Sequence, residues 1–401
     1  MAREMKDSGI EWIGNIPAEW AIVSIGRLFQ ITAGGDAKPE FYSDTQDTEH
    51  PFPVFTNSMN KDQVYAYTSK PLFEKDTITV TGRGTIGTAF YRQIPYDAII
   101  RLLSLSPKLD LDGRFYAYWI NNVIHFFTDS AAVGQLSSIQ MASYKTVYCT
   151  KQEQFKIADF LDRECSRINA VIEQTRASIE EYKKLKQAVI TQAVTKGIRP
   201  NRPMKDSGIE WIGEIPFEWN TISIGRLFSI SAGGDAKPEF YSDVQDEEHP
   251  YPVYTNSMSK NQVYAYTSKP IFEKGTVTVT GRGAIGTAFY RETPYDAIIR
   301  LLSLRPKLDL DGRFYAYWIS NVIHFFTDSA AVGQLSAIQM ASYKTIYCQK
   351  EEQSVIADYL DAECSKIDIL ISKKELLLSE IELYKKSLIY EYVTGKKEVP
   401  A

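Results

Sequence analysis

The chain has 401 residues, of which 44% are hydrophobic and 24% charged, and its formal net charge is −5. This composition is typical of a globular protein with a core large enough for two domains, and it argues against a simple basic nucleic-acid binder, which would rely on clustered Lys and Arg. There is no run of 18 apolar residues, so we expect no membrane span. The first residues lack the apolar stretch of a signal peptide, so we expect a cytoplasmic protein.

A long internal repeat dominates the sequence. Residues 5–154 recur as residues 204–353 with a constant offset of 199 and no gap, and about 83% of the positions are identical. A repeat of this length is too long for a solenoid and indicates a duplicated domain. Two like domains joined in this way often take a pseudo-twofold arrangement. We predict β-rich units over residues 1–150 and 199–349, each followed by a spacer, over 151–198 and 350–401.

Each β-rich unit is predicted to be α+β and mostly sheet. In the first copy, Thr77–Thr81 and Thr88–Tyr91 are β-branched and aromatic runs separated by glycines, and Ile99–Leu105 reads as a buried strand. A helix is expected from about Gly113 to Phe127. Its apolar face would comprise Phe115, Tyr118, Trp119, Val123 and Phe126.

The two spacers are predicted to be long helices that pair as an antiparallel coiled coil. Apolar residues recur every seven positions in both segments, which is the coiled-coil signature. In the first helix these are Leu161, Ile168, Thr175, Tyr182 and Val189, supported by Ile172, Ile179 and Leu185; in the second they are Leu360, Ile367, Ile381 and Leu388, with Lys374 as a polar interruption. Gly197 and Gly395 would end the helices. The charge balance, +3 over residues 151–200 and −3 over 350–398, suits pairing with each other.

The four cysteines, Cys149, Cys165, Cys348 and Cys364, lack the spacing of a metal knuckle. We expect buried, reduced thiols and no metal site.

In its layout and in several short motifs, the chain resembles the specificity subunits of type I restriction–modification systems. The resemblance rests on the opening Lys6–Trp20, on Ala33–Asp36 and Gly134–Gln140, and on Glu153-Gln154 followed by Ile157–Asp162, which returns as Glu352-Gln353 and Ile356–Asp361. It covers nearly the whole chain. One departure is that Thr150-Lys-Gln152 stands where the family often has a Pro-Pro pair.

The resemblance implies a non-catalytic subunit that recognises double-stranded DNA through two target-recognition domains held by the two spacer helices. It also implies two methylation subunits, which bind S-adenosylmethionine and methylate adenine N6, and two motor–nuclease subunits using ATP and Mg²⁺ where cleavage occurs. No cofactor is expected in this chain. Methylation subunits that close around DNA would supply much of the positive charge that this chain lacks.

Arg83 is the first candidate for DNA contact. Gly82-Arg-Gly-Thr-Ile-Gly87 fits the GxGxxG pattern, but a strand-like run follows it where a dinucleotide site needs a helix. A glycine-flanked hairpin suits DNA better, because Arg83 could donate two hydrogen bonds to guanine O6 and N7. The alternative is a turn with an exposed arginine.

The remaining candidates lie in three polar loops. Side chains there could reach bases or phosphates, although ordinary turn chemistry and solvated charge explain them equally well. In the first copy they are Lys38, Asn57, Ser58, Lys61, Gln135, Ser137 and Gln140; in the second copy the set is Lys237, Asn256, Ser257, Lys260, Arg282, Gln334, Ser336 and Gln339.

Two near-identical readers should bind two like half-sites, so we expect a gapped, palindromic target. Two other classes of protein stay open on the sequence alone. One is a duplicated ligand module held apart by a coiled coil, without DNA. The other is an enzyme that uses Gly82–Gly87 as a phosphate loop.

Overall fold

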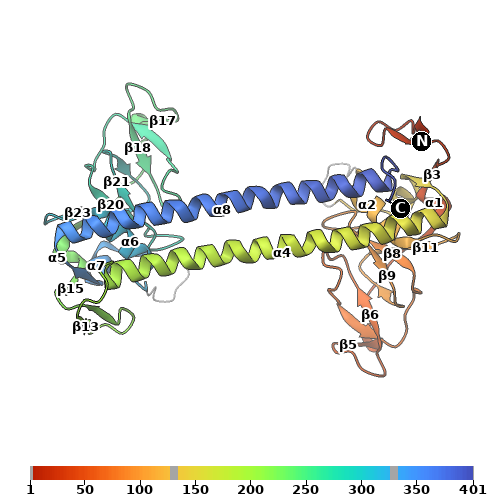
Figure 1. Cartoon of the computed structure of the whole chain (residues 1–401), viewed down its shortest axis with the longest axis horizontal. Helices are drawn as coiled ribbons and strands as arrows, with labels where there is room; N and C mark the ends of the chain where they lie inside the picture. The colour runs from red at the N-terminus through yellow and green to blue at the C-terminus, as the bar shows by residue number, and fades with distance from the viewer. Residues whose placement is uncertain (1–2, 127–133, 326–332, 401) are drawn as a thin grey trace. The chain divides into compact units, whose positions relative to one another are not determined.

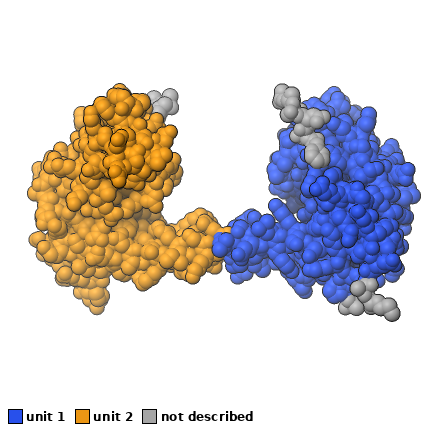
Figure 2. All heavy atoms as spheres, turned by 90° about the horizontal axis from the view of Figure 1, so that it is seen from above, with its two compact units in different colours: residues 1–176, 376–401 blue, residues 177–375 orange. Residues whose placement is uncertain are grey.

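The computed structural model describes residues 3–126, 134–325 and 333–400. It contains two compact units, residues 1–176 with 376–401 and residues 177–375 (Figure 2). Each unit combines one copy of the repeat with part of both long helices. Within the described ranges, no helix has both the length and the apolar character needed to cross a bilayer.

In the described residues, the first copy is built from short strands, three short α-helices and one 3-10 helix. Its elements are β1 (Met5–Asp7), β2 (Asn15–Pro17), β3 (Ala21–Ser24), α1 (Ile25–Leu28), β4 (Phe29–Ala33), η1 (Pro39–Phe41), β5 (Tyr42–Ser43), β6 (Phe52–Phe55), β7 (Ala66–Thr68), β8 (Thr77–Val80), β9 (Ala89–Arg92), β10 (Asp97–Ala98), β11 (Leu103–Pro107), α2 (Gly113–Asn122), α3 (Ser138–Ser143) and β12 (Lys145–Tyr148).

Two four-stranded sheets form this copy. One is antiparallel with strand order β4-β11-β8-β9, and the other has order β10-β6-β7-β5 with the β10–β6 pair parallel. The pairs β3–β12 and β1–β2 form smaller antiparallel ladders. Helix α2 packs on β8 and β9, burying Phe115 and Trp119, and so closes the core of the first sheet.

The second copy repeats this order. Its elements are β13 (Met204–Asp206), β14 (Glu214–Pro216), β15 (Asn220–Ser223), α5 (Ile224–Leu227), β16 (Phe228–Ala232), η2 (Pro238–Phe240), β17 (Tyr241–Ser242), β18 (Tyr251–Tyr254), β19 (Ala265–Thr267), β20 (Thr276–Val279), β21 (Ala288–Arg291), β22 (Asp296–Ala297), β23 (Leu302–Pro306), α6 (Gly312–Asn321), α7 (Ala337–Ser342) and β24 (Lys344–Tyr347).

The two long helices are α4 (Lys151–Lys196) and α8 (Lys350–Val393). In each unit the start of one helix lies beside the end of the other, so the pairing is antiparallel as predicted (Figure 1). In the first unit, Ile157 and Leu161 of α4 share a core with Leu388 and Tyr392 of α8. Gly197 and Gly395 follow the helix ends with φ near +70°, which confirms the predicted stops.

The coiled-coil seam has two rows. Leu161, Ile168, Thr175, Tyr182 and Val189 form the row that the sequence predicts, and the second row is Cys165, Ile172, Ile179, Lys186 and Ala193. The structure places Leu185 outside both rows, with 48% of its surface exposed, so its predicted supporting role is wrong. The neighbouring residue, Lys186, takes the seam position in the second row and pairs with Asp368 of α8 at 2.7 Å.

Two predicted boundaries also need correction. Helix α2 ends at Asn122, five residues before Phe127, which lies outside the described residues. Strand β11 begins only at Leu103, because Ile100 and Arg101 have φ values of 54° and 62° and form a left-handed turn. Extended backbone cannot include such residues.

Candidate nucleic-acid interface

Several loops meet at one end of the β4-β11-β8 sheet. Leu103, the first residue of β11, pairs with both Ala33 and Val80, the last residues of β4 and β8. The loops that leave these strands, around Gly34, Gly82 and Ile100, therefore lie together. We call these loops, together with Asn57 and Gln135 that bond to them, the loop cluster; it includes the predicted site residues Asn57, Arg83 and Gln135.

Asn57 joins these loops with every polar atom of its side chain. Its Oδ1 accepts hydrogen bonds from the backbone N–H of Gly82 at 2.7 Å and of Arg83 at 3.2 Å. Its Nδ2 donates to the carbonyl of Ile100 at 2.5 Å. Because an amide of this size has few further sites to offer, Asn57 positions the cluster.

Arg83 is exposed in the hairpin between β8 and β9. One end of its guanidinium, Nη2, donates to Oε1 of Gln135 at 3.1 Å, and the backbones of Arg83 and Gln135 form an isolated β-bridge. Gln135 thus orients Arg83. The strand on each side of Gly82–Gly87 is as the sequence predicted, so this GxGxxG segment lacks the helix that a dinucleotide site requires.

The sequence reasoning missed Arg101. It reads Ile99–Leu105 as strand, whereas the structure exposes Arg101 on the left-handed turn beside Asn57. Among the residues that the structure describes, neither Arg83 nor Arg101 forms an ion pair with a carboxylate. The cluster therefore exposes two guanidinium groups without a carboxylate partner among these residues, and Arg83 uses its Nη2 in the bond to Gln135.

Lys38, Ser58 and Lys61 lie in the neighbouring loops. Lys38 is exposed just before η1, and Ser58 donates its hydroxyl hydrogen to Gln63 at 2.7 Å. Lys61 is exposed, and its carbonyl accepts from Nη1 of Arg92 at 2.7 Å. Arg92 itself is buried over the ring of Phe55, and burial lowers the pKa of its guanidinium to about 10. It holds this loop in place.

Ser137 and Gln140 have a local structural task. Ser137 is the N-cap of α3 and accepts from the N–H of Gln140, whose side chain accepts in return from the N–H of Ser137. This reciprocal pair is a capping box. Contact with DNA through these side chains would compete with the cap.

The second copy repeats the cluster. Asn256 accepts from Gly281 and Arg282 and donates to Ile299, and Arg282 donates to Gln334 at 3.1 Å. Ser336 and Gln339 form the same capping box. Lys237 is exposed before η2, Ser257 donates to Gln262, and Lys260 lies 3.8 Å from Glu292. The two copies thus present the same candidate side chains, although Glu292 beside Lys260 stands where the first copy has Gln93.

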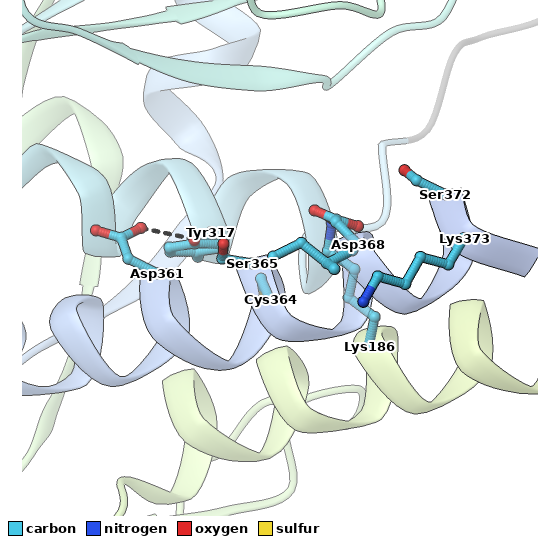
Figure 3. Close-up of a pocket in the computed structure, with 9 residues that line it drawn as sticks. Lys186, Tyr317, Asp361, Cys364, Ser365, Asp368, Ser372 and Lys373 are labelled. Carbon is cyan, nitrogen blue, oxygen red and sulfur yellow. Dashed lines mark hydrogen bonds and ion pairs between the residues drawn. The ribbon is translucent and has the colours of Figure 1, made fainter.

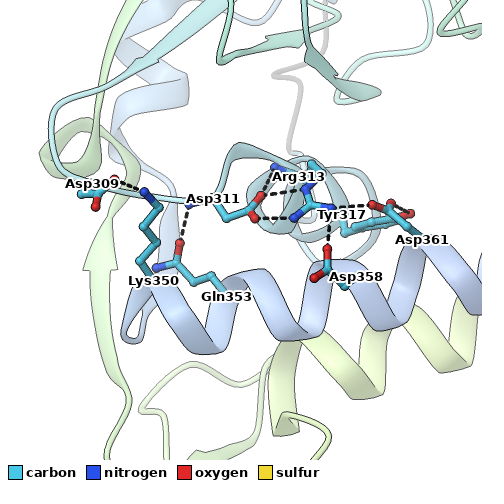
Figure 4. Close-up of polar contacts among 8 residues, drawn as sticks. All are labelled: Asp309, Asp311, Arg313, Tyr317, Lys350, Gln353, Asp358 and Asp361. Atoms are coloured by element: carbon cyan, nitrogen blue, oxygen red, sulfur yellow. Dashed lines mark hydrogen bonds and ion pairs between the residues drawn. The ribbon is translucent and has the colours of Figure 1, made fainter.

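Each copy is anchored to a long helix through the Glu-Gln pair at the helix start. In the second copy Gln353 is fully buried, and its Oε1 accepts from the N–H of Asp311 (Figure 4). Its Nε2 donates to the carbonyl of Cys348. Arg313 adds ion pairs to Asp311, Asp358 and Asp361. Gln154 makes the equivalent bonds in the first copy.

A hollow of about 510 Å³ lies between α6 and the helix pair (Figure 3). Tyr317 donates to Asp361 on its wall, and Lys186 pairs there with Asp368. Burial raises the pKa of the Cys364 thiol, which keeps it protonated and unreactive. All four cysteines are buried and free, as predicted. Within the described part of the chain, no cluster of His, Cys, Asp and Glu could hold a metal ion.

These features define a duplicated recognition protein. Its two β-rich domains expose equivalent arginine clusters and are anchored on a pair of long helices. Residues 17–181 and 216–379 match the family described as the type I restriction modification DNA specificity domain. The chain belongs to the family of type I specificity subunits. Such subunits recognise DNA and are not the catalytic members of their systems.

Individual relatives agree with this assignment. A protein of Mycoplasma pneumoniae named as a type I specificity subunit is 23% identical over 84% of this chain and 88% of its own length. A second from the same organism is 30% identical over 160 residues, and there the match spans only about half, 48%, of the relative. The specificity subunit of the type I restriction enzyme EcoDI of Escherichia coli is 19% identical over 46% of this chain and 40% of its own length.

Solved structures show the same fold. A chain from a structure on assembly and conformational transition of the type I R-M system has a TM-score of 0.72, with 11% identity, 95% of this chain covered and 99% of that chain. The HsdS subunit from Thermoanaerobacter tengcongensis has a TM-score of 0.51, with 12% identity over 95% of this chain and 98% of that one. The predicted α+β domains and long helix pair are therefore confirmed.

Proposed function

We propose that this chain directs adenine-N6 methylation to a gapped, palindromic, bipartite DNA target. The observation that carries the proposal is the loop cluster, in which each copy exposes two arginines that form no ion pair with a carboxylate among the described residues. Because Arg83 and Arg282 occupy the same surroundings, they should read the same base in two half-sites. The half-sites are inverted if the copies are related like the subunits of a twofold dimer, with centres roughly 34 Å apart.

The partners follow from the same proposal. Two methylation subunits would bind S-adenosylmethionine, and two motor–nuclease subunits would add cleavage with ATP and Mg²⁺. This chain carries a net charge of −5, so much of the phosphate neutralisation falls to the methylation subunits. The complex would work in the cytoplasm, where host DNA lies.

The test begins with a search for an adenine methylase gene beside this one. The chain is then co-expressed with that methylase, and N6-methyladenine is mapped in host DNA. We expect a gapped palindromic motif that disappears when this gene is deleted. An asymmetric bipartite motif would refute the palindrome but keep the specificity subunit. A host without a new motif, and a chain that co-purifies with no methylase, would instead favour a scaffold.

A further inference from the structure

The turn at Ile100 and Arg101 is strained in a way that glycine would relieve. Both residues have positive φ values, and the equivalent Ile299 and Arg300 have the same values, 54° and 62°. A β-branched residue in this region is a genuine outlier, since its Cβ crowds the following carbonyl. At Asp76, another left-handed position, the second copy has glycine as Gly275. At the turn, neither copy does.

Three other segments hold the turn in this conformation. The N–H of Ile100 donates to the carbonyl of Gly35 at 2.9 Å, and the N–H of Arg101 donates to that of Gly34 at 3.2 Å. Asn57 donates to the carbonyl of Ile100. The carbonyl oxygen of Arg101 lies only 2.8 Å from where a Cβ on Gly82 would stand, so Gly82 allows this close approach. Strain maintained by such surroundings is characteristic of functional sites.

The strained backbone fixes the point from which the Arg101 side chain leaves the turn. Arg101 is exposed and without a carboxylate partner among the described residues, and Ile100 beside it is 44% exposed. Asn57 bonds the backbones of both Ile100 and Arg83, so the turn and the hairpin project from one rigid base. The planar fork of donors on an arginine side chain matches the O6 and N7 acceptors of guanine in the major groove, and here its backbone attachment point is fixed.

We propose that Arg101 and Arg300 are specificity-determining residues, each reading a guanine in its own half-site. The inference rests on the proposed function and adds a residue in each copy that the sequence pattern hides. A phosphate contact would need the charge but not the strained, fixed geometry.

The test uses the chain in complex with its methylation subunits. The variants are Arg101→Gly alone and Arg101→Gly with Arg300→Gly, because glycine suits the backbone and folding is not threatened. We expect the melting temperature to hold or rise. We expect the single variant to relax one guanine in one half of the methylated motif, and the double variant to relax it in both halves.

Binding of duplexes that carry the wild-type motif supplies the magnitude. Loss of a two-bond arginine–guanine contact should weaken binding of that motif about 5- to 150-fold per half-site, while binding to a duplex with that guanine replaced should change little. Equal weakening on both duplexes would assign Arg101 to the phosphate backbone and overturn the inference.

Two matched controls separate strain and charge from reading. Asp76→Gly relieves a left-handed residue outside the turn and copies what the second repeat already has. Arg27→Ala with Arg226→Ala removes exposed arginines near the opposite end of β4 and β16 from the turn. Both should leave the motif unchanged. If the Arg101 and Arg300 variants methylate the same motif as the wild-type protein, this inference alone is overturned. If the wild-type protein itself directs methylation to no motif, the proposed function is overturned as well.

Discussion

Replacing Asn57 with alanine tests whether this residue positions the loops or reads a base. The variant loses two accepted hydrogen bonds, from Gly82 and Arg83, and one donated bond, to Ile100. At roughly 0.5–1.5 kcal/mol of net stability for each bond, the free energy of unfolding of the first unit should fall by about 1.5–4.5 kcal/mol. The left-handed turn loses one support, so recognition should weaken as well.

Urea denaturation followed by tryptophan fluorescence measures this loss, since Trp20 and Trp119 are buried in the first unit. The matched control is Asn60→Ser in the same loop, because the second copy already has Ser259 at that position. We expect the control to lie within 0.5 kcal/mol of the wild type, roughly the range for surface substitutions. An Asn57→Ala variant as stable as the control, but with a changed base in its methylated motif, would show that Asn57 reads DNA directly.

Three further predictions concern the anchor and the core. Gln154→Leu should destabilise the first unit by about 2–6 kcal/mol in urea, because the buried N–H of Asp112 and carbonyl of Cys149 each lose a partner; the exposed Gln152→Leu should not. Burial raises the pKa of Asp311, but hydrogen bonds from Arg313 outweigh it and lower the pKa overall. The stabilisation is therefore present above the unfolded pKa of about 3.9 and is lost as pH falls through the folded value, so Asp311→Asn should flatten acid denaturation below about pH 4. Burial raises the pKa of all four thiols, so a thiol reagent at pH 8 should modify none in the native chain and all four in denaturant.

Local patterns in the sequence predict the hairpin, the α2 helix and the long helices, because each depends on neighbours in the chain. The turn at Ile100 escapes such reasoning. Ile-Ile-Arg-Leu has the composition of a strand, and only Gly34, Gly35 and Asn57, more than 40 residues away, impose the left-handed backbone. Tertiary contacts override local preference here.

The sequence predicts which loops form the candidate site, but it does not predict what each side chain in those loops does. Glycine and polar clusters locate the loops that hold Arg83, Asn57 and Gln135. The 2.7 Å bond from Gly82 to Asn57 spans 25 residues, and the bond from Arg83 to Gln135 spans 52. Which side chain supports another, and which projects, depends on these long-range pairs. Leu185 is a similar case, since only the second row of the seam shows that Lys186 takes the inner position.

The divergence of the two spacer helices acquires a physical reason from their pairing. Arg176 of α4 pairs with Glu382 of α8 at 2.9 Å, and Glu375 of α8 raises the pKa of Lys183, although the main cause there is Glu180 on the same helix. The repeat offset of 199 relates Arg176 to Glu375 and Lys183 to Glu382. If a second copy of α4 replaced α8, Lys183 of one copy would therefore face Arg176 of the other. If a second copy of α8 replaced α4, Glu375 of one copy would face Glu382 of the other. Exposed pairs of this kind are individually weak, but both self-pairings turn attraction into repulsion. Near-identical recognition domains keep the two readers alike, while unlike helices direct each spacer to the other.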